Sequence, residues 1–129
     1  MSSSRRVACI AGARPNFMKI APVMRALDAS SSLEGLVVHT GQHYDTNMSA
    51  VFFDQLGIPR PAFDLEVGSA SHGVQTGRIM IAFDEAFDDV APDLVLVVGD
   101  INSTVACAMV AKKRGVPVVH VEAGLRSFD

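Results

Sequence analysis

The stretch LVLVVGDINST, residues 94–104, decides how this chain folds. Its first five residues are apolar and mostly β-branched, and a second run of this kind, VPVVHV, occupies residues 116–121. Short, continuous apolar runs are typical of strands that are buried on both faces of a parallel sheet. An acid closely follows each run, Asp100 after the first and Glu122 after the second. Because open α/β sheets bind ligands outside the carboxyl ends of their strands, the two acids indicate a small-molecule site.

Strand and helix patterns alternate along the rest of the chain. We expect strands at residues 6–11, 36–40, 63–67, 94–98 and 116–121, and helices at residues 15–29, 45–56, 73–90 and 102–114. This alternation predicts an α/β fold with a doubly wound parallel sheet and right-handed crossovers. A strand order of 3-2-1-4-5 would place the first and fourth strands side by side at the switch point, where ligands bind.

Composition narrows the class of protein. A length of 129 residues corresponds to one domain, and a hydrophobic content of 49 % is enough to build a core. The net charge is −3 and the basic residues are scattered singly, which excludes a nucleic-acid partner. No apolar run is long enough to span a membrane, and the first residues do not resemble a signal peptide. We therefore expect a cytoplasmic protein, with a secreted one as the weaker alternative.

Neither cysteines nor histidines show the spacing of a metal site. Cys9 and Cys107 lie within apolar patterns, so we expect buried thiols and no disulfide. His43 and His72 lie in turns at the predicted ligand edge, whereas His120 alternates within the last strand and is expected to pack in the core. Three further polar residues could reach the ligand crevice, but a surface hydrogen-bonding role is the favoured expectation for each of them: Gln42, Gln75 and Arg78.

A cationic turn follows the first predicted strand. In GARPN, residues 12–16, Arg14 lies at the start of a helix, where backbone N–H groups and the helix dipole favour anions. Lys19 follows about one turn later. The pattern leaves two alternatives of equal weight, an anion site or two solvated side chains.

For each of the two acids, a structural role, namely helix capping, is weighed against a functional role. Asp100 precedes Asn102, and residues of both types often cap helices, so capping is an alternative to a functional role. Glu122 is not followed by a helical pattern, so capping does not explain it. Between Val121 and Ala123 its pKa is expected to rise by desolvation, which suits proton transfer.

Five motifs, taken together and in this order, resemble the N-terminal part of the non-hydrolysing UDP-N-acetylglucosamine 2-epimerases. They are GARP with KIAP (12–15 and 19–22), TGQHY (40–44), VGS with QT (67–69 and 75–76), GDINST (99–104) and HVEAGLR (120–126). The resemblance implies that residues 1–129 form a Rossmann-like domain, the N-terminal half of a glycosyltransferase type B arrangement. It also implies interconversion of UDP-N-acetylglucosamine and UDP-N-acetylmannosamine, without a cofactor, by elimination and re-addition of UDP.

The resemblance assigns roles to single residues. Two acids match catalytic positions, Asp100 and Glu122. Four further residues match substrate-binding positions, Arg14, Lys19, His43 and Arg126. Some bacterial members bind a second UDP-N-acetylglucosamine as an activator, and the candidate residues for that site are Gln42, His43 and Arg78. Asp45 departs from the glutamine of those members, and Asn16 replaces an acid that often follows Arg-Pro.

The same resemblance implies that part of the family's machinery follows Asp129. An acid and an arginine in a Pro-Glu-Glu-x-x-Arg segment, a catalytic histidine and the whole second domain would lie there. We therefore expect a chain that is inactive alone and that needs its C-terminal half or a split partner. The alternatives are a non-catalytic fragment that serves as an interaction module, and a hydrolysing relative that releases N-acetylmannosamine and UDP. The resemblance further implies a homodimer.

Overall fold

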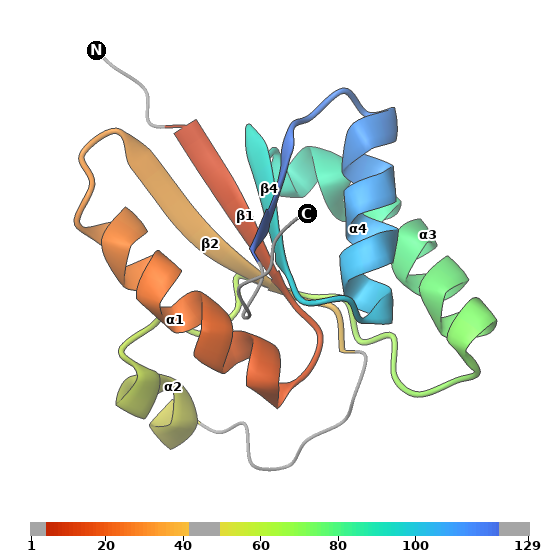
Figure 1. Cartoon of the computed structure of the whole chain (residues 1–129), viewed down its shortest axis with the longest axis horizontal. Coiled ribbons are helices and arrows are strands. Elements are labelled where there is room, and N and C mark those ends of the chain that lie inside the picture. The colour runs from red at the N-terminus through yellow and green to blue at the C-terminus, as the bar shows by residue number, and fades with distance from the viewer. Residues whose placement is uncertain (1–4, 42–49, 122–129) are drawn as a thin grey trace.

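Five parallel strands form the central sheet in the computed structural model of the chain, which describes residues 5–41 and 50–121 (Figure 1). The strands are β1 (Arg5–Ala11), β2 (Leu33–His39), β3 (Phe63–Asp64), β4 (Leu94–Val98) and β5 (Val118–Val121). Their order across the sheet is β3-β2-β1-β4-β5. The structure therefore confirms both the α/β class and the predicted order of the strands.

Helices cover both faces of this sheet (Figure 1). They are α1 (Arg14–Asp28), α2 (Ala50–Leu56), α3 (His72–Val90) and α4 (Asn102–Lys113). Phe17 and Ile20 of α1 pack with Cys9 of β1 on one face, and Phe83 of α3 packs with Ala8 of β1 on the other. Neighbouring residues of a strand point to opposite faces, so the buried part of β1, residues 7–11, is apolar on both faces.

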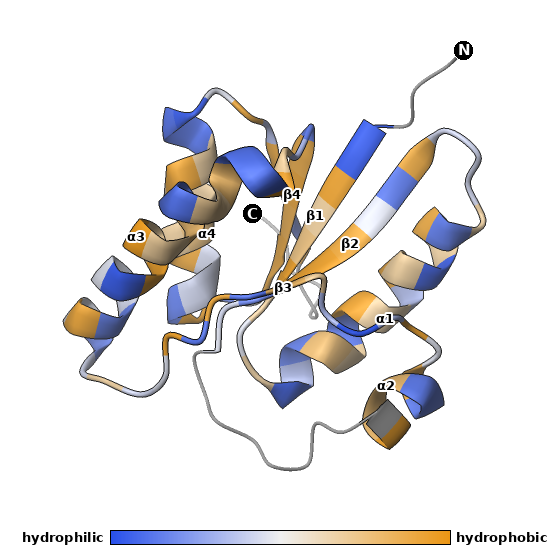
Figure 2. Ribbon diagram, turned by 180° about the vertical axis from the view of Figure 1, so that it is seen from behind, coloured by the Kyte–Doolittle hydropathy of each residue, from blue (hydrophilic) through white to orange (hydrophobic). Residues whose placement is uncertain are grey.

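In Figure 2 the strands are mostly orange, apart from the blue start of β1 and the blue and white bands of β2, and the helices alternate between orange and blue. Cys9 and Cys107 are both fully buried free thiols, which confirms their reading as small core residues. In the described ranges, no helix combines the length and the apolar character that a membrane span requires.

Four strands differ from the prediction at their ends. β1 begins at Arg5, one residue before the predicted residue 6. β2 begins at Leu33, earlier than the predicted residue 36, because Leu33 already pairs with Arg5 although its side chain is exposed. β3 contains only Phe63–Asp64 of the predicted 63–67, since Glu66 has a φ of 55° and turns the chain out of the sheet. β5 begins at Val118 after Pro117, which has no N–H to donate to a ladder.

The helices also differ from the predicted bounds. α1 begins and ends one residue earlier than the predicted 15–29, and α3 begins at His72, one residue before the predicted residue 73. α4 ends at Lys113 rather than at the predicted residue 114, because Arg114 forms its C-cap. α2 is described from Ala50, and the predicted start of this helix at residues 45–46 lies outside the described residues.

Because the strands are parallel, all their carboxyl ends lie at the same edge of the sheet. The chain leaves β1, β2 and β4 at this edge, and α1, α3 and α4 begin there. We call this edge the carboxyl rim, and its described turns are residues 12–13, 40–41, 68–71 and 99–101. Any ligand site of the kind predicted from the sequence must lie here.

Burial on α3 predicts how two neighbouring substitutions differ. Phe83→Ala is expected to lower the free energy of unfolding by about 3–5 kcal/mol, because Phe83 is fully buried and stacks edge-on against Phe87. Ile81→Ala on the same helix should change it by less than about 0.5 kcal/mol, since Ile81 is 61 % exposed. Urea unfolding of the two variants measures the difference, and equal losses would contradict this description of the core.

Candidate functional site

Asp100 lies at the carboxyl rim, directly after the turn that ends β4. Gly99 forms this turn with a φ of 70°, a conformation that side chains disfavour. The N-cap of α4 is Ile101, which makes no side-chain capping bond, so the helix-capping explanation of Asp100 is wrong. The Asp100 side chain is exposed, and no described residue forms a hydrogen bond or an ion pair with its carboxylate. This acid is therefore available for chemistry at the rim.

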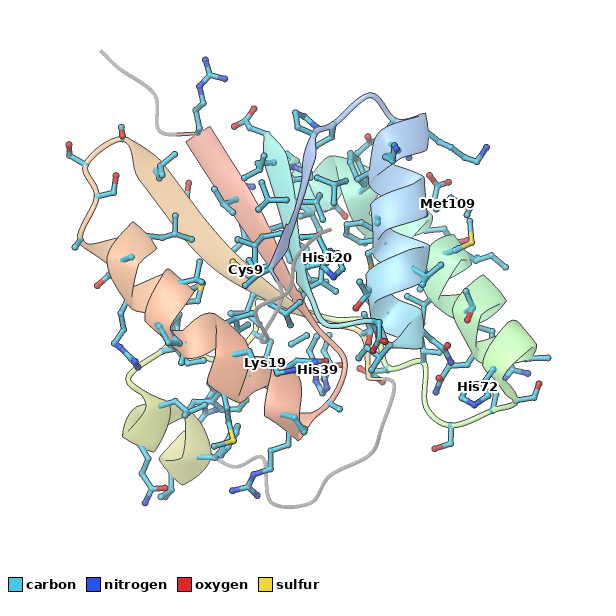
Figure 3. All side chains as sticks on the ribbon, viewed as in Figure 1. Cys9, Lys19, His39, His72, Met109 and His120 are labelled. Atoms are coloured by element: carbon cyan, nitrogen blue, oxygen red, sulfur yellow. The ribbon has the colours of Figure 1, made fainter. Side chains whose placement is uncertain are left out.

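Lys19 reaches this turn from α1 (Figure 3). A side-chain carbon built onto Gly99 would lie 3.9 Å from Lys19 Nζ. The ammonium group and the turn that carries Asp100 are thus close in space, although they are far apart in the sequence. The strand order produces this proximity, because β1 and β4 are neighbours in the sheet.

Arg14 is placed differently from Lys19. Its guanidinium lies 4.6 Å from the centre of the Phe52 ring, so the side chain is directed toward α2. The residue remains exposed at the start of α1. The structure therefore brings one of the two predicted cations to the Asp100 turn and leaves the other on the α2 side of the rim.

Asn16 orders the turn between β1 and α1. Its side-chain oxygen accepts hydrogen bonds from the backbone N–H groups of Gly12, at 2.8 Å, and Ala13, at 3.1 Å. This role of Asn16 was not predicted from the sequence, although an amide side chain at the third helical position is a known signal for capping. Asn16 is 5 % exposed, so this bonding is part of the folded turn rather than a surface contact.

A buried glutamine connects α3 with α4. Gln75 Nε2 donates to the carbonyl of Gly68 at 2.9 Å, and Asn102 Nδ2 donates to Gln75 Oε1 at 2.8 Å. Asn102 Nδ2 also lies 3.1 Å from His72 Nδ1. The predicted surface role of Gln75 is wrong, since the residue is only 4 % exposed. Arg78, by contrast, is exposed on α3 as expected.

Two hydroxyl groups that the sequence analysis did not predict to interact meet below the rim. Thr40 Oγ1 and Ser103 Oγ lie 2.7 Å apart, and the two residues are 0 % and 1 % exposed. They join the end of β2 to the first turn of α4 across β1. Each belongs to a quoted motif, but nothing in the spacing of the two motifs indicates that they touch.

His120 does not pack in the core as predicted. It is exposed on β5, which is the last strand of the described sheet, and its Nε2 is hydrogen-bonded to the carbonyl oxygen of Gly99. This contact holds the peptide that precedes Asp100. The chain leaves β5 at the same rim, because Val121 pairs with Val98. Four residues of the predicted site lie outside the described residues, namely Gln42, His43, Glu122 and Arg126.

His39 is a buried histidine at the end of β2 that the sequence analysis passed over. Its ring packs edge-on against Phe17 with 5.2 Å between the ring centres, and Nδ1 lies 3.7 Å from a carboxylate oxygen of Asp64. Burial lowers the pKa of His39, and the negative charge of Asp64 opposes this shift only in part. His39 Nε2 has no hydrogen-bond partner among the described residues.

The electrostatics of the rim favour an anionic ligand. Three helices, α1, α3 and α4, direct their N-terminal ends toward it, and the N-terminal end of a helix carries a partial positive charge. Lys19 adds a full positive charge beside the Asp100 turn. Within residues 5–41 and 50–121, no three His, Cys, Asp or Glu side chains cluster closely enough to hold a metal ion.

A family profile matches most of the chain. The profile of the family described as UDP-N-acetylglucosamine 2-epimerase matches residues 25–129. The chain belongs to this family. This match confirms the resemblance inferred from the motifs.

Individual relatives agree with this assignment. A UDP-N-acetylglucosamine 2-epimerase homolog of Methanococcus maripaludis is 48 % identical over 124 residues, which are 96 % of this chain and 34 % of the relative. A UDP-2,3-diacetamido-2,3-dideoxy-D-glucuronate 2-epimerase of Pseudomonas aeruginosa is 46 % identical and covers 96 % and 35 %. The crystal structure of the Methanocaldococcus jannaschii UDP-GlcNAc 2-epimerase with UDP-GlcNAc and UDP superimposes with a TM-score of 0.84 at 43 % identity, covering 96 % and 34 %. This chain therefore spans about a third of the length of these relatives.

Asn16 allows a test of the turn that begins α1. Asn16→Ala is expected to lower the free energy of unfolding by about 1–3 kcal/mol, because two backbone N–H groups lose their acceptor. Asn16→Asp retains the acceptor and adds a negative charge near a helix N-terminus, so it should be no less stable than the unsubstituted chain. Thermal and urea unfolding compare the variants, and equal destabilisation by both would contradict this role.

His39 predicts how stability depends on pH. The pKa of His39 is lowered from 6.5 in the folded chain. Between this lowered pKa and pH 6.5, the folded state therefore binds fewer protons than the unfolded state. Stability is therefore expected to be full above pH 6.5 and to fall as the pH drops through the lowered pKa. Urea midpoints between pH 5 and pH 8 should show this slope, and His39→Gln should reduce it. His72→Gln, at an exposed histidine, is the control and should leave the slope unchanged.

Proposed function

We propose that the chain contributes the N-terminal, Rossmann-like domain of an epimerase that interconverts UDP-N-acetylglucosamine and UDP-N-acetylmannosamine. The observation that carries the proposal is the exposed carboxylate of Asp100, without a described partner, in a turn that Lys19 approaches. The family assignment gives the reaction class. The M. jannaschii relative, whose crystal structure contains UDP-GlcNAc and UDP, supports a sugar nucleotide as the ligand.

The proposed reaction needs a base and a cation at the same rim. A carboxylate removes the proton from C2 of the sugar while the bond between C1 and the UDP oxygen breaks, which gives a 2-acetamidoglucal and UDP. An acid then returns a proton to the other face of C2 as the UDP oxygen adds to C1 again. No carbonyl activates C2, so the charge that develops at C1 as UDP leaves must supply the acidity.

The chain's own residues divide these tasks. Asp100 and Glu122 are the proposed proton carriers, and the charge that develops at C1 is stabilised by the same carboxylates. Lys19 and the N-terminal end of α1 would hold the departing diphosphate, because both present positive charge at the rim. Arg14, His43 and Arg126 are proposed to bind other parts of the sugar nucleotide. We also propose that a second UDP-N-acetylglucosamine binds as an activator, at Gln42, His43 and Arg78.

One relative suggests an alternative substrate. The P. aeruginosa relative, at 46 % identity, acts by its name on a UDP-linked diacetamido sugar with a carboxylate. The same elimination and re-addition at C2 would epimerise such a sugar, because the chemistry does not involve the carboxylate at C6. We therefore propose UDP-2,3-diacetamido-2,3-dideoxy-D-glucuronate as the alternative substrate. Hydrolytic release of N-acetylmannosamine and UDP is the alternative reaction.

The partners of the chain are also part of the proposal. The relatives are about three times as long as the stretch they share with this chain, so a C-terminal nucleotide-binding domain would complete the ligand site at the carboxyl rim. We propose that this half is needed for turnover, that the complete enzyme is a homodimer and that it works in the cytoplasm. The 129-residue chain alone is expected to give no UDP-N-acetylglucosamine from UDP-N-acetylmannosamine, and appreciable turnover would contradict this expectation.

A chimera tests the catalytic role of Asp100. Residues 1–129 are joined to the remaining two-thirds of the M. jannaschii relative, and epimerisation is followed by NMR in D2O. The chimera should interconvert the two UDP sugars and introduce deuterium at C2. Asp100→Asn should lower the rate about 100- to 10,000-fold, because the proton carrier is lost. Asp89→Asn, at an exposed acid of α3, is the control and should retain the rate.

Three other results would contradict parts of the proposal. A folded chimera without turnover on either UDP sugar would contradict the function. Full activity of the Asp100→Asn chimera would contradict the role of this acid. Release of free N-acetylmannosamine would favour the hydrolysing reaction instead.

A further inference from the structure

Four hydrogen bonds close a ring at the carboxyl rim. They join the Gly68 N–H to the Gly41 carbonyl at 2.6 Å, Gln75 Nε2 to the Gly68 carbonyl at 2.9 Å, Asn102 Nδ2 to Gln75 Oε1 at 2.8 Å, and Thr40 Oγ1 with Ser103 Oγ at 2.7 Å. The covalent bonds between residues 40 and 41 and between residues 102 and 103 complete the ring. We call this set of residues the rim ring.

Three of the four side chains in the rim ring are buried, and the fourth, Asn102, is half-buried. Thr40, Gln75 and Ser103 are 0 %, 4 % and 1 % exposed. In such surroundings a hydrogen bond is strengthened by the low dielectric, so removal of one partner has a marked cost in free energy. The ring therefore fixes the first turn of α4 relative to the end of β2 and the start of α3.

The backbone on the other side of Asp100 is held as well. Thr104 Oγ1 donates to the Val98 carbonyl at 2.8 Å, and the Gly99 N–H donates to the Val121 carbonyl at 3.3 Å. Asp100 is thus held between two bonded segments, while no described residue engages its carboxylate. A rigid backbone that carries an uncommitted acid is what a proton carrier requires, because a displacement of about 1 Å can cost 100-fold in rate.

We infer that the rim ring holds Asp100 in its catalytic position and that Thr40, Ser103 and Gln75 are positioning residues for the epimerisation. The inference rests on the proposed function, since it concerns the reaction of Asp100. None of the three side chains needs to touch the sugar nucleotide. Their contribution is to hold the backbone of residues 99–102 in a fixed position relative to the sheet.

A matched pair of substitutions at Thr40 isolates the hydrogen bond. Thr40→Val keeps the shape of the side chain and removes the hydroxyl group, whereas Thr40→Ser keeps the hydroxyl group. Thr76→Val is the control, because the Thr76 hydroxyl donates to the His72 carbonyl within α3 and lies outside the ring. Gln75→Glu breaks a different link, since a carboxylate lacks the amide donor that binds the Gly68 carbonyl.

The first measurement uses the 129-residue chain itself. Amide hydrogen exchange of residues 100–103 should become about five- to tenfold faster in Thr40→Val and in Gln75→Glu, as expected for the loss of one buried hydrogen bond. Exchange of the β1 amides should change less, and Thr40→Ser and Thr76→Val should resemble the unsubstituted chain. Unchanged exchange at residues 100–103 in both ring variants would overturn the inference.

The second measurement uses the chimera described above. Thr40→Val should lower kcat about 10- to 100-fold with KM nearly unchanged, and Thr40→Ser should restore kcat. Normal kcat in Thr40→Val would overturn the inference even if exchange were faster. If the unsubstituted chimera is folded but inactive, the proposed function fails, and the exchange measurement still decides whether the ring holds the Asp100 turn.

Discussion

The parallel pairing of β1 with β4 is the constraint on which the remaining structure depends. Val7, Ala8 and Cys9 pair with Leu94, Val95 and Leu96, although most of the chain lies between the two strands. Because the crossovers are right-handed, this pairing sends α1 and α2 to one face of the sheet and α3 and α4 to the other. It also makes the turn after β1 and the turn after β4 neighbours, so that Lys19 approaches Gly99. The carboxyl rim is thus a consequence of backbone topology before any side chain contributes.

The sequence predicts the elements whose side chains are buried and misses the ends where only the backbone pairs. β4 has the predicted bounds because all its residues face apolar neighbours and form a continuous apolar run. The start of β2 carries exposed Leu33 and Glu34, and no pattern distinguishes an exposed pair in a strand from a loop. β3 is cut short by the backbone of Glu66, which the apolar residues on either side of it do not reveal. The apolar pattern reports which side chains are buried, whereas the hydrogen-bonded strand can be longer, as in β2, or shorter, as in β3.

Some features of the candidate site can be predicted from the sequence, and others cannot. The positions of Asp100 and Lys19 follow from strand order, which the alternation of patterns predicts. The contacts of Gln75 and Thr40 do not follow from it, because their partners lie 27 and 63 residues away in the chain. Single polar side chains have no periodicity, so a buried hydrogen-bond network leaves no pattern in the sequence. His120 shows the converse, since its strand position predicts a core residue, whereas the last described strand leaves it exposed.

The two thiols described with the core have a practical meaning. Burial raises the pKa of Cys9 to about 12 and raises that of Cys107 as well, so both thiols stay protonated at neutral pH. Neither is accessible to an alkylating or oxidising reagent while the chain is folded, since both are 0 % exposed. The chain contains no other cysteine. A cysteine introduced on an exposed helix surface would therefore accept a fluorophore or a spin label at one site, without removal of the native thiols.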